Sequence, residues 1–145
     1  QAATRYYDIA PLREKRERIG LSPAEETKLA ALEARMEIRL DIMRRMLEFG
    51  MKDRIVPGTD SGVQNFAFGH LDYDLQILTQ IGFTPSEALI SATKTSAEAI
   101  GMSDQIGTLE VGKIADLVAL DGDPSKDIGV CSRIRAVFLE GTQVS

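Results

Sequence analysis

Apolar residues recur every three or four positions between residues 23 and 49. The main stripe consists of Leu29, Leu32, Met36, Leu40, Met43 and Leu47. This spacing is typical of one buried face of an α-helix. A second stripe consists of Ile38, Ile42, Met46 and Phe49. The two stripes together predict a helix from Pro23 to Phe49 whose C-terminal half is buried over a wider arc.

The ends of this helix carry recognisable signals. Ser22 can cap the free N–H groups, Pro23 suits the first helical position, and Glu25 completes a capping box. Gly50 then offers a left-handed stop. The segment that begins at Thr84 repeats the same device, and we predict a third capping box over residues 95–98. A further helix is predicted from about His70 to Ile81, followed by the stop residue Gly82, and Gly101 is predicted to end the last helix.

The remaining segments have short apolar runs typical of β-strands. Arg54–Pro57 reads as a short strand, Thr108–Glu110 as another strand, and residues 111–113 as a turn. The apolar run Asp116–Asp121 is bounded by acids and has the length of a buried strand. Ile134–Glu140 is predicted as a strand that starts a hairpin into Val144. Helices and one strand therefore precede a group of strands, which predicts two units, residues 1–107 and residues 108–145.

The first 20 residues show no clear onset of a strand or a helix. Arg13–Arg18 is a dense run of charges, which we interpret as a solvated loop or helix face. A beginning of this kind is what we expect from a piece of a larger chain.

Composition narrows the class of protein. The chain has 145 residues, of which 43 % are hydrophobic and 27 % charged, and its net charge is −5. A net negative charge argues against a nucleic-acid partner, and no apolar run approaches the roughly 20 residues that span a bilayer. The one cysteine, Cys131, excludes an internal disulfide and favours a reducing compartment, so we expect a cytoplasmic protein.

One carboxylate, Asp60, follows the short predicted strand inside the string Gly-Thr-Asp-Ser-Gly, residues 58–62. Taken alone, this string favours an Asx-turn residue that caps the following loop. His70 is the one histidine of the chain. A metal site built on histidines therefore cannot be assembled from these residues alone.

Two longer strings that follow GTDSG change this interpretation. GTDSG is followed by FGHLDYDLQILTQIGFTPSEALISATKTSAEAIGM and then by IGTLEVGKIADLVALDGDP. In this order, from about Arg54 to Val144, they resemble the C-terminal part of an amidohydrolase-superfamily enzyme. The resemblance is closest to the imidazolonepropionase and prolidase-like branch.

The resemblance implies an α/β fold. The chain would be the C-terminal portion of a (β/α)8 TIM barrel together with the C-terminal strands of a small β-sandwich. Ile55 and Val56 would lie on the eighth barrel strand, and Asp60 would follow it on the C-terminal face, where such barrels carry their catalytic residues. The long helix before it would belong to the seventh βα unit.

The same resemblance implies the chemistry of the site. Asp60 would be both a metal ligand and the general base for a metal-activated water that attacks a carbonyl-type carbon next to nitrogen. The metal of this family is usually zinc. Thr59, Ser61 and Gly62 would form the loop that binds substrate. We interpret His70 first as a polar residue at the helix start and second as a substrate contact.

Most of the family's metal ligands are missing from this sequence. Family enzymes carry a His-x-His pair after the first barrel strand, a lysine or glutamate further on, and two later histidines. A catalytic zinc needs about three protein ligands, and Asp60 supplies one. We therefore expect a fragment that is inactive alone. Another chain, or copies of this chain, would supply the other metal ligands and cover the exposed strand edge.

Three functions follow as hypotheses. The first is part of a metal-dependent hydrolase that acts on a C–N bond of an amide, a dipeptide or a cyclic amide. The second is a non-catalytic remnant or interaction domain without bound metal. The third is part of a deaminase of the same superfamily, in which ammonia leaves.

Overall fold

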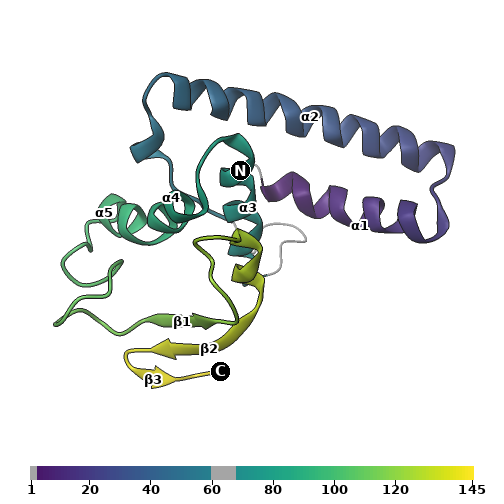
Figure 1. The fold of residues 1–145 in the computed structure, drawn as a ribbon. Helices are drawn as coiled ribbons and strands as arrows, with labels where there is room; N and C mark the ends of the chain where they lie inside the picture. Colours follow the sequence, from purple (N-terminus) through teal and green to yellow (C-terminus); the bar gives the residue numbers. More distant parts are fainter. Residues whose placement is uncertain (1–2, 60–67) are drawn as a thin grey trace.

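The computed structural model describes residues 3–59 and 68–145, with side chains from residue 8 onward. Helices come first: α1 (Ala3–Ile19), α2 (Pro23–Glu48), a 3₁₀ turn (Lys52–Arg54), α3 (Leu71–Ile81), α4 (Pro85–Ile90), a π turn (Ser91–Thr95) and α5 (Ser96–Ala99). The strands follow: β1 (Leu117–Leu120), a 3₁₀ helix (Ile128–Ser132), β2 (Ile134–Leu139) and β3 (Thr142–Gln143). The helices lie above a small sheet (Figure 1). The chain is therefore mixed α/β, as predicted.

Residues 3–19 form a helix, which the sequence pattern did not reveal. α1 runs from Ala3 to Ile19 with Pro11 inside it, and it lies side by side with α2 (Figure 1). Ile9 points into the core with 2 % of its surface exposed. The helix was missed because its charged residues show little amphipathic period, and its stability comes from packing on α2 rather than from local propensity.

The long helix α2 confirms the predicted start and end. Ser22 accepts a hydrogen bond from the Glu25 backbone N–H, and the Glu25 side chain binds the Ser22 backbone in return. The helix ends at Glu48, and Gly50 takes the left-handed conformation at φ +73°. The residues of the main stripe that are buried are Leu29, Leu32, Met36 and Leu40.

The prediction of a second buried stripe on α2 is wrong at three of its four positions, whereas Met46 is partly buried and packs against the core. Ile38 is 62 % exposed, Ile42 is 55 % exposed and Phe49 is 83 % exposed. These positions lie on the side of the helix opposite to the face that packs on α1 and α3. Within the described residues, only one face of α2 is covered, and the spacing of apolar residues alone cannot distinguish one covered face from two.

The helices α3 and α4 form the centre of the fold. α3 begins after His70 and ends at Ile81, followed by Gly82 at φ +120°, as predicted. The capping box of Thr84 and Glu87 is also confirmed. The third box is wrong, because Thr95 is itself helical at φ −65° and ψ −37° and makes no side-chain cap. The backbone instead continues from α4 through the π turn into α5 without a break.

One apolar core joins the two halves of the sequence. Its centre is made by α3, where Ile77 is 1 % and Leu78 is 2 % exposed. α2 covers one side of this helix, and the 3₁₀ helix near the C-terminus packs on it through Ile128. The remaining buried members are Ile9, Leu29, Leu32, Met36, Leu40, Ile55, Leu75, Ile81, Phe83 and Ala88. The segment before the candidate loop is thus fixed at Ile55 by burial in this core.

The sheet is antiparallel, in the order β1-β2-β3. Leu117 lies opposite Phe138, and the register shifts between Ala119 and Leu120. The predicted hairpin from β2 into β3 is confirmed. Thr108–Glu110 is not a strand, however, and the strand predicted as buried is half-open, with Val118 56 % exposed.

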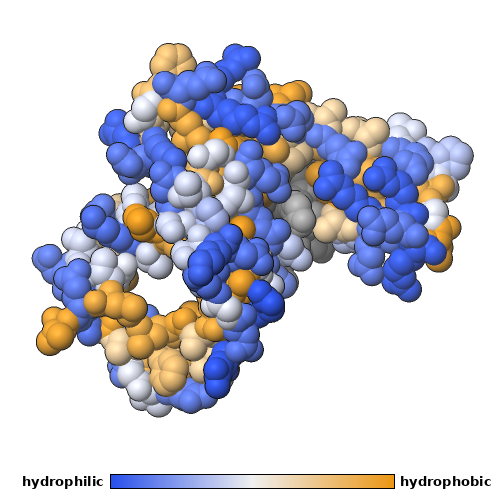
Figure 2. All heavy atoms as spheres, in the orientation of Figure 1, coloured by the Kyte–Doolittle hydropathy of each residue, from blue (hydrophilic) through white to orange (hydrophobic). Residues whose placement is uncertain are grey.

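The open side of the sheet explains that error. Figure 2 shows apolar surface gathered at the sheet end of the molecule. The exposed apolar residues of this region are Leu109, Val111, Val118, Ile134, Leu139 and Val144. A continuous apolar run therefore marks a strand correctly, but it does not establish that both faces are covered in the described structure.

Candidate functional site

The segment that leads into the candidate site is extended but belongs to no sheet among the described residues. After the 3₁₀ turn Lys52–Arg54, Ile55 takes β-type angles of φ −98° and ψ 122°. The prediction of a strand over residues 54–57 is wrong for the described residues, since no ladder forms there. A strand needs a neighbouring strand to bind its backbone groups, and here the Ile55 carbonyl instead accepts a hydrogen bond of 2.6 Å from the Ser91 hydroxyl.

The predicted site residues fall on both sides of a gap in the described chain. Asp60, Ser61 and Gly62 lie outside the described residues, so their predicted roles remain predictions. Thr59 is half-buried at the end of the extended segment. His70 is the residue before α3, where its ring stacks on Tyr73 with 5.5 Å between ring centres.

The first turn of α3 carries two carboxylates next to His70. The Asp72 Oδ1 atom lies 3.8 Å from the His70 Nδ1 atom, and its side chain is 11 % exposed. Asp74 is buried with 7 % of its surface exposed. Among the described residues its Oδ2 atom has no hydrogen-bond partner. The structure thus brings His70 and Asp72 together and adds a buried carboxylate that the sequence analysis did not select.

A signal for the burial of Asp74 is present in the sequence. Ile77, Leu78 and Ile81 follow it at spacings of three, four and seven, and all three are buried. Asp74 therefore occupies the apolar face of its own helix. Comparison of Asp74 with that apolar face would have identified it.

Burial governs the acid–base properties of this region. It raises the pKa of Asp74 to about 6, and the neighbouring Asp72 carboxylate contributes to the rise. Burial also raises the pKa of the Cys131 thiol, assisted by the Asp72 and Asp127 carboxylates. A raised thiol pKa disfavours the reactive thiolate, which agrees with a structural role for Cys131.

We predict that Asp74→Asn stabilises the chain at neutral pH. The pKa of Asp74 is raised from 3.8 to about 6 in the folded chain. The folded state therefore holds its proton more tightly, and the free energy of unfolding decreases as the pH rises from about 4 to about 6. The variant lacks this loss and is expected to be more stable at pH 7 by about 2–3 kcal/mol.

The measurement is urea denaturation at several pH values between 4 and 7. Asp104→Asn, the same change at an exposed position, serves as the control and should follow the parent at each pH. A parent and an Asp74→Asn variant with parallel pH profiles would show that the buried carboxylate is not the titrating group.

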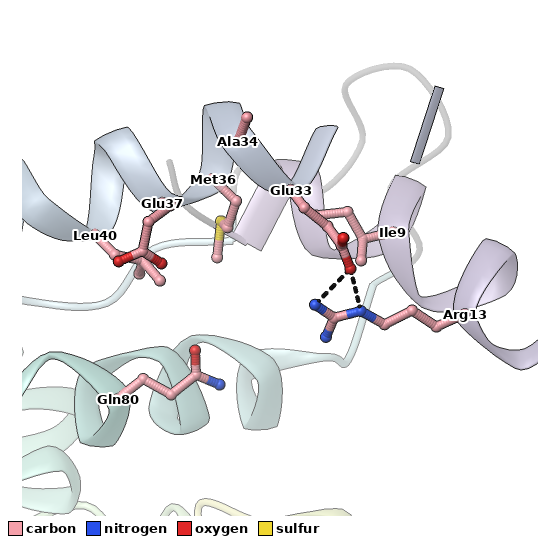
Figure 3. Close-up of a pocket in the computed structure, with 8 residues that line it drawn as sticks. All are labelled: Ile9, Arg13, Glu33, Ala34, Met36, Glu37, Leu40 and Gln80. Carbon is pink, nitrogen blue, oxygen red and sulfur yellow. Dashed lines mark hydrogen bonds and ion pairs between the residues drawn. The ribbon is translucent and has the colours of Figure 1, made fainter. Parts of the chain in front are cut away.

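Two hollows lie among the described residues. The larger, about 410 Å³, lies between α1, α2 and α3 (Figure 3). Its apolar floor includes Ile9 and Met36, and across it the Arg13 guanidinium binds Glu33 at 2.7 Å. Neither Thr59 nor His70 lines it. The smaller hollow, about 160 Å³, is lined by Lys52, Asp53, Phe83, Glu87, Ile90, Ser91 and Thr95, and thus lies beside the segment that leads to Thr59.

The part of the chain that the structure describes does not fit a metal site. Within residues 3–59 and 68–145, no group of three or more His, Cys, Asp or Glu side chains is placed to hold a metal ion. Over the same residues, no helix has the length and apolar character needed to cross a membrane.

Comparison with known proteins shows which protein family the chain resembles in sequence. A model of the amidohydrolase family matches residues 3–144. The imidazolonepropionase of Syntrophobacter fumaroxidans is 38 % identical over 79 residues, which are 54 % of this chain and 18 % of the relative. The imidazolonepropionase of Symbiobacterium thermophilum is 38 % identical over 78 residues, again 18 % of its length. The chain thus spans about a fifth of these curated relatives.

Solved structures extend the likeness to nearly all of the chain. A Xaa-Pro dipeptidase with methionine in its active site superimposes with a TM-score of 0.70 and 28 % identity, over 99 % of this chain and 33 % of that one. A prolidase solved with N-methylphosphonate-L-proline gives a TM-score of 0.55 and 29 % identity, over 94 % of this chain and 33 % of that one.

Proposed function

This chain belongs to the amidohydrolase family, and we propose that it is the C-terminal part of a metal-dependent enzyme that hydrolyses a C–N bond. The observation that carries the proposal is the superposition on a Xaa-Pro dipeptidase over 99 % of the chain. The relatives named imidazolonepropionase support the same branch of the family. The substrate class we propose is a dipeptide or a cyclic amide.

Asp60 is the proposed proton acceptor of the reaction. It follows the extended segment that ends at Thr59, and α3 begins eleven positions later in the sequence. The carboxylate takes a proton from the attacking water as the water oxygen bonds to the carbonyl-type carbon, and it returns that proton to the leaving nitrogen. Thr59, Ser61 and Gly62 are proposed to bind substrate from the same loop.

His70 is the proposed second substrate contact. It lies at the start of α3, at the other end of the loop from Thr59, and its Nδ1 atom faces Asp72 at 3.8 Å. A neighbouring carboxylate favours one orientation of an imidazole ring, so the Nε2 atom is the atom we propose for substrate contact.

The family is generally metal-dependent, and zinc is the metal we propose. The described residues do not fit such a site, so the ligands besides Asp60 belong to other parts of the full-length enzyme. We accordingly propose a barrel portion over residues 1–107 and a sandwich portion over residues 108–145. The remaining barrel strands, on the same or another chain, would complete the site.

The proposal is tested by the metal content and the turnover of two proteins. The full-length enzyme, meaning the natural protein that contains this chain, is expected to hold about one or two zinc ions. It should hydrolyse Xaa-Pro dipeptides, measured by the release of the amino acid product, or open the ring of a cyclic amide. The 145-residue chain alone is expected to hold less than about 0.1 zinc ion and to show no turnover.

Three results would contradict the proposal. A full-length enzyme with no bound metal and no hydrolysis of any C–N substrate would favour the non-catalytic interaction domain. Release of ammonia with retention of the rest of the substrate would favour the deaminase. One zinc ion bound tightly by the 145-residue chain would show that its own residues form the metal site.

A further inference from the structure

We propose that Ser91 is a positioning residue for the loop that carries Asp60. Its buried hydroxyl is oriented by a π turn and anchors the backbone of the extended segment at Ile55, five residues before Asp60. The consequence for catalysis rests on the function proposed above for Asp60. The anchoring itself does not depend on that function.

The anchor is a hydrogen bond between distant parts of the chain. The Ser91 hydroxyl donates to the Ile55 carbonyl at 2.6 Å, across 36 positions of sequence. Ser91 is 3 % exposed and Ile55 is 9 % exposed. Because water cannot replace the donor at a buried carbonyl, the loss of this bond leaves the carbonyl unsatisfied or forces the segment to move.

The π turn fixes the backbone of Ser91. The Ser96 backbone N–H binds the Ser91 carbonyl across five positions, and the Ser96 hydroxyl donates to the same carbonyl at 2.8 Å. A π turn inside a helix is rare and often marks a functional position. Here the bond from the Ser96 hydroxyl fixes the wider turn of the backbone at Ser91. The direction of the Ser91 hydroxyl is therefore set by this turn and by its bond to Ile55.

A neighbouring hydroxyl on the same turn makes only a local bond. Thr93 donates to the Leu89 carbonyl at 2.7 Å, four positions earlier in the same helix. Thr93 is exposed. Its bond resembles the ordinary return bond of a helical threonine, whereas the bond of Ser91 leaves the helix and reaches the extended segment. Thr93 is therefore a matched control for the loss of one hydroxyl.

A second contact holds the start of the segment. The Lys52 ammonium binds the Glu87 carboxylate at 2.6 Å and lies 5.1 Å from the centre of the Phe83 ring. Lys52 begins the 3₁₀ turn that ends one residue before Ile55. The segment is thus held to α4 at its start and to the π turn at Ile55, and the chain from there to Asp60 is at most about 18 Å long.

The geometry gives Ser91 a measurable consequence for turnover. A displacement of about 1 Å at a reacting group lowers turnover by as much as about 100-fold. Loss of the anchor at Ile55 allows displacements of this size at Asp60, because the intervening segment forms no strand ladder in the described residues. A fall in kcat is expected together with a change in KM, since the proposed substrate-binding residue Thr59 lies on the same extended segment.

The test compares Ser91→Ala with Thr93→Ala in the full-length enzyme. Ser91→Ala is expected to speed hydrogen exchange of the peptide covering residues 52–59 by at least about 10-fold and to lower kcat by about 10- to 100-fold. Thr93→Ala is expected to leave both unchanged. Ser91→Thr, which restores a hydroxyl, is expected to recover most of the lost turnover.

Each failure has a distinct meaning. Exchange of residues 52–59 that is equal in Ser91→Ala and Thr93→Ala overturns the anchor. Faster exchange with parental kcat overturns the positioning role. If Ser91→Ala does not fold, Ser91→Cys, which keeps the volume and weakens the donor, must show faster exchange or the anchor is overturned. Failure of the function proposed for Asp60 appears separately, as unchanged turnover in an Asp60→Asn variant.

Discussion

Asp60→Asn in the full-length enzyme is expected to lower kcat by about 100- to 10,000-fold. The amide keeps the size of the carboxylate but cannot accept the proton of the attacking water, and removal of a general base costs this much in enzymes. The measurement is steady-state turnover on whichever Xaa-Pro dipeptide or cyclic amide the parent hydrolyses. KM is expected to change much less, because Asp60 is proposed to act on the proton rather than to hold the substrate.

The control for this variant is Asp53→Asn. Asp53 is an exposed acid on the 3₁₀ turn seven positions earlier, so the same chemical change there should leave kcat within about twofold. Metal content must be measured for all three proteins. Near-parental turnover of Asp60→Asn at full metal occupancy would remove Asp60 from the catalytic machinery and would favour the Asx-turn interpretation of the loop.

Gly107→Ala is expected to lower the free energy of unfolding by about 3 kcal/mol or more. Gly107 has a φ of +93°, and a Cβ atom there would lie 2.6 Å from the Ala97 Cβ atom and 3.0 Å from the Thr93 carbonyl oxygen. Ala97 is only 3 % exposed, so it cannot move aside freely. The left-handed backbone and the overpacking are both unfavourable, and their free energies add.

Gly101→Ala separates these two contributions. Gly101 also has a positive φ, +72°, but a Cβ atom there would meet nothing within 4 Å. The expected loss is only about 1–2 kcal/mol, from the left-handed backbone alone. The measurement is the free energy of unfolding from urea denaturation of the chain. Equal losses for the two variants would show that Gly107 has room for a side chain.

Local chemistry in the sequence was sufficient to predict most of the helices. Ser22 and Thr84 each bind the backbone three positions later, and Gly82 takes the conformation that ends a helix. These signals need no information from distant residues, so the limits of α2 and α3 and the start of α4 were predicted nearly as observed. The ordered strings around residues 54–144 likewise predicted the family that the family model supports.

The candidate site was predictable only in part. The sequence selected Thr59 and His70, which the structure places on either side of residues 60–67. It did not select Asp74, although Ile77 and Leu78 at spacings of three and four place Asp74 on the apolar face of its helix. It also did not indicate the bond from Ser91 to Ile55, because no sequence pattern relates two residues 36 positions apart.

The sequence by itself determined the limits of α2 and α3, because capping bonds and turn glycines act within a few residues, and its ordered strings identified the family. Only the tertiary structure decided which apolar faces are covered, that Thr95 lies inside a helix, and that α1 forms at all. Burial depends on the neighbours that folding brings together. The same helical spacing of apolar residues is therefore core at Leu29 and surface at Ile38, and the same residue type is exposed at Asp104 and buried at Asp74.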